Sequence, residues 1–168
     1  MAFVSTPGAA DANSLTSVEY ADAYFAERAN ATWAALSLAD KQSALILGTD
    51  YLVATYEGTW AGERASGTQA LPWPRREVYS DGYALPSDTI PGRLQMATAE
   101  AALRSRSGAL IEDQGQRVIR EKVDVLETEY AETSDPTKRY PMVSALVAPL
   151  LRISVGGGGF VAARLVRV

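Results

Sequence analysis

The chain contains neither cysteine nor histidine. Without cysteine there are no disulfides and no thiolate metal sites, and without histidine the commonest metal ligand and general base are missing. The motifs Gly-x-Ser-x-Gly, Ser-x-x-Lys and Gly-x-x-x-x-Gly-Lys, which mark nucleophilic serines and phosphate-binding loops, do not occur either. We therefore expect a protein that is not an enzyme and that holds no cofactor and no metal.

A surplus of positive charge is also lacking. The chain carries 16 Lys and Arg residues against 20 Asp and Glu residues, a formal net charge of −4. A dedicated nucleic-acid binder normally shows the opposite balance. No apolar run is long enough to cross a bilayer, and the first ten residues lack the basic and apolar regions of a signal peptide. We expect a protein made in a cytoplasm, with no membrane partner.

Helical spacing of apolar residues dominates the chain. At 168 residues, of which 47% are apolar, it fits one domain with a sizeable core. Helices are predicted at residues 16–28, 37–56, 90–108 and 140–151. Their start and stop signals are Thr16 with Glu19, Ser37, Pro91 and Pro149. Alanines at positions 97, 99, 101 and 102 allow a neighbouring helix to approach closely. We predict a mainly α fold, a small bundle of about four helices.

The segment 58–91 has no such periodicity, although it is rich in aromatic residues. Its run Leu71-Pro72-Trp73-Pro74-Arg75 holds a large ring on stiff backbone, because each proline fixes its own φ. Two interpretations compete. In the first, a stacking platform for single-stranded nucleic acid is formed by Trp60, Arg64, Trp73, Arg75 and Arg76. In the second, the long loop is anchored on the bundle by Trp60, Arg64, Trp73 and Arg75. The acidic balance favours the anchor.

Residues 117–131 alternate apolar and charged side chains, which predicts a β-hairpin with one wet face. The region around it is strongly acidic, and such a cluster is usually a solvated face. As a functional alternative, Glu127, Glu129 and Glu132 are a candidate acidic face toward a channel or a partner. An extended N-terminal arm, residues 1–13, precedes the first helix.

The end of the chain differs in composition from the rest. Four glycines, 156–159, form a tether, and bulky apolar residues then alternate with small or basic ones. A loose terminus is one interpretation. We favour a docking arm, residues 153–168, appended to a helical domain at residues 1–152. The candidate docking residues are Arg152, Phe160, Val161, Arg164, Leu165, Val166, Arg167 and Val168.

Several short motifs, taken in order, resemble those of a known protein group. They are Asp11-Ala12-Asn13-Ser14, Tyr20-Ala21-Asp22-Ala23-Tyr24-Phe25, Ala44-Leu45-Ile46, Thr49-Asp50-Tyr51-Leu52, Trp60, Gly62, Arg64, Gln69-Ala70-Leu71-Pro72-Trp73-Pro74-Arg75 and Ile90-Pro91. Together they resemble tailed-phage proteins that are often labelled DnaT-like single-stranded DNA-binding proteins and that look like head-tail connector (adaptor) subunits. The resemblance runs from about residue 11 to residue 151.

This resemblance implies two functions. As a connector, the protein would form a homo-oligomeric ring, commonly of twelve copies, beneath the portal protein in the neck of the virion. It would contact the portal and the next neck or tail-completion protein, and double-stranded DNA would pass through its channel during genome packaging. As a single-stranded DNA-binding protein, it would stack bases on Trp60 or Trp73. The negative net charge and the dispersed arginines favour the connector.

Overall fold

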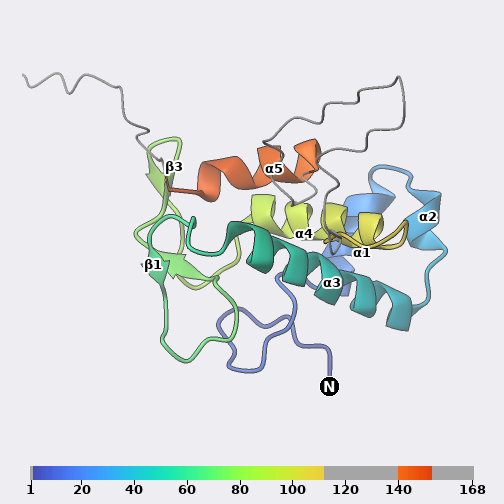
Figure 1. Ribbon diagram of the computed structural model, residues 1–168, viewed down its shortest axis with the longest axis horizontal. Helices are drawn as coiled ribbons and strands as arrows, with labels where there is room; N and C mark the ends of the chain where they lie inside the picture. Colours follow the sequence, from blue (N-terminus) through green and yellow to red (C-terminus); the bar gives the residue numbers. More distant parts are fainter. Residues whose placement is uncertain (1, 112–139, 153–168) are drawn as a thin grey trace, which may run out of the picture.

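The computed structural model describes residues 2–111 and 140–152, and it confirms the predicted mainly α fold (Figure 1). Its helices are α1 (Val18–Ala26), α2 (Ala31–Ala34), α3 (Leu38–Tyr56), α4 (Gly92–Ser105) and α5 (Pro141–Val147), the last continued by the 3₁₀ turn η1 (Ala148–Leu150). Helix α4 is central, because it contacts α1, α3 and α5. The part of the chain that the structure describes contains no helix long and apolar enough to cross a membrane.

The ends of the helices follow the local signals closely. The Ser37 hydroxyl accepts the backbone N–H of Asp40 at 3.2 Å, so α3 begins where its cap predicts. Pro91 precedes α4, and Pro149 limits α5 to seven residues before the 3₁₀ turn. The first helix is a correction: its cap is Ser17 and not Thr16, since the buried Thr16 hydroxyl donates instead to Oε1 of Gln95 on α4.

Helices α3 and α4 pack at very short range. Ala97, Ala99, Ala101 and Ala102 are fully buried, as the alanine pattern predicts. The facing position on α3 is Gly48, where a β-carbon would lie 2.7 Å from the Thr98 carbonyl oxygen and 2.8 Å from the Ala102 backbone nitrogen. Only a residue without a side chain fits there at this separation.

Helix α2 was not predicted, because four residues are too few to show a helical period. It is capped by Asn30, whose side chain accepts the Trp33 backbone N–H. The Trp33 ring packs on Phe25 with 4.9 Å between ring centroids, and its indole N–H donates to Asp22 at 2.7 Å. Helix α2 thus closes the second of two core clusters, between α1 and the first half of α3.

The segment between α3 and α4 contains two small antiparallel sheets that sequence reasoning missed. Strand β1 (Glu63–Arg64) pairs with β2 (Arg75–Arg76), and β3 (Tyr79–Ser80) pairs with β4 (Tyr83–Ala84). Asp81 and Gly82 join β3 to β4 with φ angles of 52° and 85°, as a tight type I′ turn requires. The hairpin predicted at residues 117–131 and the arm at 153–168 lie outside the described residues.

Candidate functional site

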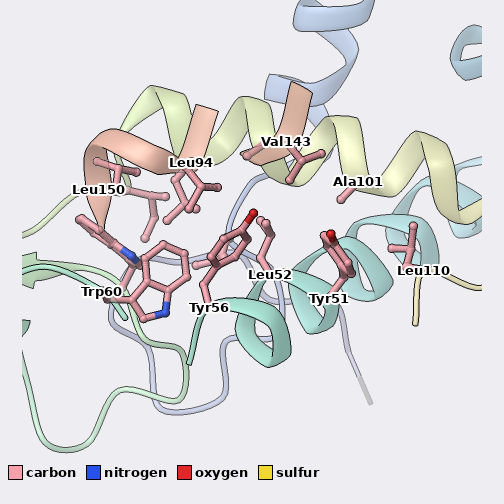
Figure 2. Packing of buried hydrophobic residues seen from close by; sticks show 14 of the residues in the cluster. Tyr51, Leu52, Tyr56, Trp60, Leu94, Ala101, Leu110, Val143 and Leu150 are labelled. Atoms are coloured by element: carbon pink, nitrogen blue, oxygen red, sulfur yellow. The ribbon is translucent and has the colours of Figure 1, made fainter. Parts of the chain in front are cut away.

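The two loop tryptophans lie in the main core cluster. Trp60 is 2% exposed and Trp73 is 1% exposed, and their rings meet edge to face with 6.0 Å between centroids. Trp60 also contacts Tyr56 of α3 at 5.7 Å, and Figure 2 shows these two residues beside Leu150 of η1. Neither ring has a face open to a base. The structure therefore does not present Trp60 and Trp73 as an open stacking platform.

The arginine between these rings is used internally as well. The guanidinium of Arg75, a buried residue, donates to the carbonyl oxygens of Ala61 at 2.6 Å, Gly62 at 2.7 Å and Pro72 at 3.2 Å. Burial, together with the neighbouring Arg152 and Arg64, lowers the pKa of Arg75. Its hydrogen bonds tie the strand that follows Trp73 to the segment that follows Trp60.

Other polar groups hold the loop in the same way. Arg64 donates to the carbonyl oxygens of Gln69 and Leu71, and the buried Gln69 amide donates to those of Leu71 and Pro74. Arg76 is exposed, but it pairs with Glu63 across β1 and β2 at 2.9 Å. The arginines of the suggested platform thus bind the loop itself. This arrangement is the one that an anchor requires.

The only candidate docking residue within the described part of the chain is Arg152. Its backbone N–H donates to the carbonyl of Thr59 at 2.8 Å, and its Nε donates to the carbonyl of Trp60 at 2.9 Å. Trp60 and Leu151 also form an antiparallel bridge. The residues after η1 are thereby fixed to the end of α3. The remaining docking candidates, and Glu127, Glu129 and Glu132, lie outside the described residues.

The β3–β4 hairpin is the most exposed aromatic feature of the described residues. Tyr79 is 65% exposed and Tyr83 is 79% exposed. Tyr79 pairs with Ala84, whereas Tyr83 pairs with Ser80, so the two tyrosines point to opposite faces of the hairpin. Glu77, Asp81 and Asp88 lie on or beside the hairpin and are exposed. The hairpin therefore offers one ring on each side, with three exposed carboxylates nearby in the sequence.

A second exposed apolar feature lies between α3 and the segment after α4. This groove, the α3 groove, has a volume of about 260 Å³ and is lined by Leu47, Asp50, Tyr51, Ser105, Gly108, Ala109, Leu110 and Ile111. Leu47 and Ile111 are about half exposed, at 49% and 47%. Figure 2 shows Tyr51 and Leu110 at the end of the core opposite Trp60. Partial burial raises the pKa of the Asp50 carboxyl group.

Within residues 2–111 and 140–152, no group of three or more acidic side chains is arranged to hold a metal ion. Sequence reasoning found neither exposed feature. The Asp81-Gly82 pair is a strong hairpin signal that was available. The α3 groove joins residues about 60 positions apart in the sequence, and spacing along the chain carries no signal of it.

Comparison with known proteins adds one finding. The family model described as "Putative DnaT-like ssDNA binding protein" matches residues 1–168. No curated protein and no solved structure matches the chain.

Proposed function

The chain belongs to the family of DnaT-like ssDNA-binding proteins, and we propose that it is a structural subunit of the head-tail connector of a tailed phage. It would act by binding other proteins, as one copy in a ring in the neck of the virion. Trp60 and Trp73 are buried in the core, and Arg75 is hydrogen-bonded to carbonyl groups of the loop, so these residues hold the loop on the bundle. The exposed apolar side chains include Leu47, Tyr79 and Tyr83 and lie on a chain of negative net charge, which suits protein contacts better than contacts with phosphates.

The observation that carries this proposal is the β3–β4 hairpin. Tyrosine is enriched at protein interfaces, because its ring buries much area while its hydroxyl stays hydrogen-bonded. A hairpin with exposed tyrosines on opposite faces presents apolar area in two directions at once. Such a wedge suits insertion between two protein surfaces, as a ring of identical subunits provides.

Ring geometry makes a further demand on the subunit. In a ring, a surface of one copy meets a different surface of the next copy, so each subunit needs two unlike patches. The hairpin and the half-exposed Leu47 and Ile111 of the α3 groove are two such patches on different elements. The proposed partners are further copies of the chain, the portal protein and the next neck protein. An acidic balance would let double-stranded DNA slide past the ring without binding to it.

The hairpin gives a direct test of the connector proposal. Full-length protein mixed with the portal protein of the same phage is expected to form closed rings in electron micrographs. The double substitution Tyr79→Ser, Tyr83→Ser should abolish the rings while the melting temperature stays nearly unchanged, since exposed substitutions shift stability by only about 0.5 kcal/mol. Leu38→Ser, at a 62% exposed apolar residue on α3, is the matched control and should still form rings.

Two outcomes count against the proposal. Absence of rings in the unmodified protein, with or without the portal, contradicts the connector function. Rings formed equally well by the double variant remove the hairpin from the interface and leave the proposal without its main support.

Binding of single-stranded DNA is the second candidate, and the description of the family favours it. With Trp60 and Trp73 buried, the largely exposed rings in residues 2–111 and 140–152 are Tyr79 and Tyr83. Stacking proteins place successive rings along one cationic groove. Here the rings face opposite ways, and the exposed Glu77, Asp81 and Asp88 lie close to them in the sequence. The local geometry therefore disfavours this candidate.

Titration of a fluorescently labelled oligothymidine at 50 mM and 200 mM salt separates the two functions. On the connector proposal, anisotropy should show no saturable binding at micromolar protein. Micromolar binding that weakens steeply with salt, and that is lost in Tyr83→Ser but kept in Leu38→Ser, would establish the second candidate instead.

A further inference from the structure

The α3 groove is an apolar surface with one carboxylate among its described lining residues. Leu47 on α3 and Ile111 after α4 line it and are about half exposed, and the Tyr51 and Leu110 residues beneath them are almost fully buried. Among the described lining residues, Asp50 is the only charged one. No lysine or arginine forms an ion pair with Asp50 in the part of the chain that the structure describes. A fitting occupant thus brings apolar side chains together with a cation.

Two segments of this chain lie outside the described residues, and their charges differ. Residues 112–139 carry eight Asp or Glu residues and five Lys or Arg residues, so their net charge is of the same sign as that of Asp50. Residues 153–168 carry Arg164 and Arg167 and no acidic residue. Their larger apolar residues are Ile153, Val155, Phe160, Val161, Leu165, Val166 and Val168. The composition of the second segment complements the groove.

The point where this segment leaves the fold brings it within reach. Arg152 is hydrogen-bonded to Thr59, just past the end of α3. Asp50 precedes the last residue of α3 by six positions, or about 9 Å along the helix at 1.5 Å per residue. Phe160 follows Arg152 by eight positions, and eight residues can span up to about 26–29 Å. The four glycines that precede Phe160 allow the chain to turn back.

The effective concentration at the groove decides whether the chain's own segment or that of a second copy occupies it. A site and a ligand joined by a short flexible linker meet at an effective concentration in the millimolar range. A second copy at micromolar concentration is therefore outcompeted by roughly a thousandfold, provided that the linker spans the distance. In the free subunit, docking within one chain is therefore favoured over docking between two copies.

We propose that the α3 groove is the docking site of the chain's own residues 160–168, with apolar side chains against Leu47 and Ile111 and an arginine against Asp50. The proposal concerns the free subunit, and it holds or fails separately from the connector function. In an assembly, a neighbouring surface would have to displace the segment before using the groove.

Because the chain contains no cysteine, a single introduced thiol can carry a spin label without side reactions. We would label Ala163→Cys with a nitroxide and record methyl NMR spectra of the full-length protein. The Leu47 and Ile111 methyl signals should be lost while the nitroxide is in its paramagnetic, oxidised form. They should return when the nitroxide is reduced. The Leu38 methyl signals, from a residue on the same helix outside the groove, should persist.

A labelled segment that moves near the groove without docking could also attenuate the methyl signals. Substitutions in the groove distinguish this case from docking. Leu47→Ser should restore the Ile111 signal, Asp50→Asn should restore it in part, and Leu38→Ser should restore nothing. If the Ile111 signal persists in the parent protein, or is lost equally in all three variants, the proposal is overturned.

A mixed sample identifies which chain docks. Spin-labelled protein without isotope enrichment is mixed with enriched protein that carries no label. Docking within one chain leaves the enriched signals of this sample intact. Loss of the Leu47 and Ile111 signals in the mixed sample to the same extent as in the single-chain sample would assign the groove to a second copy and overturn the proposal.

Discussion

Trp73→Ala is expected to lower the free energy of unfolding by about 3–5 kcal/mol, the usual cost of removing a buried tryptophan. Trp73 is 1% exposed and meets Trp60 edge to face within the main core cluster, so its loss leaves a cavity that stiff neighbours cannot close. Since whole domains are stable by about 5–15 kcal/mol, about a fifth or more of the stability is at stake. Urea denaturation followed by circular dichroism measures the change.

Two substitutions sharpen this prediction. The Trp73 indole N–H has no hydrogen-bond partner among the described residues, so Trp73→Phe loses volume but also removes an unsatisfied donor. We expect Trp73→Phe to cost much less than Trp73→Ala. Tyr83→Ala removes a ring of similar size from the 79% exposed position and should change stability by only about 0.5 kcal/mol. Equal stabilities of Trp73→Ala and Tyr83→Ala would refute the anchor.

Gly48→Val is expected to destabilise the fold by about 3 kcal/mol, at the upper end of what overpacking costs. A β-carbon at position 48 already lies 2.7 Å from the Thr98 carbonyl oxygen and 2.8 Å from the Ala102 nitrogen, and both are backbone atoms of α4. Neither can yield without moving the helix. Thermal unfolding should show the loss as a lower melting temperature.

The matched control for Gly48→Val lies on the same helix. Ala54 of α3 is exposed, so Ala54→Val carries the propensity cost of a branched side chain, below about 0.7 kcal/mol, without the clash. Gly48→Ala separates the two effects further, because alanine gains about 1 kcal/mol of helix propensity over glycine. If Gly48→Ala raised the stability, the close approach of α3 and α4 would not exist in solution.

Helix boundaries were readable from the sequence wherever a local device sets them. Ser37 caps α3 through its own hydroxyl, and Pro149 ends α5 by removing a backbone donor, so nearest neighbours suffice to predict both. The cap of α1 was wrongly predicted at Thr16, because the Thr16 hydroxyl bonds Gln95 on α4 and Ser17 caps the helix instead. A capping pattern predicts the neighbourhood of a helix start, while side-chain partners elsewhere in the chain select the residue.

The candidate site was only partly predictable. Trp73 between two prolines indicates a large ring on stiff backbone, and the acidic balance of the chain favours the loop anchor over the stacking platform. The hydrogen bonds of Arg75 to Ala61 and Gly62 do not, because they depend on how the loop closes on itself. The Asp81-Gly82 turn was overlooked because its strands are two residues long, too short to show alternation. The exposed β3–β4 hairpin and the α3 groove became visible only in the tertiary structure.

The attachment of Arg152 has a mechanical consequence. A pull on the chain beyond residue 152 meets the Arg152 bonds to Thr59 and Trp60 before it reaches η1 or α5. Tension therefore passes into the joint between α3 and the tryptophan loop, where several hydrogen bonds and packed rings must yield together. Helix α5 is shielded from being unwound one turn at a time. The hydrogen bonds of Arg152 therefore bear a load on the C-terminal end of the chain before helix α5 does.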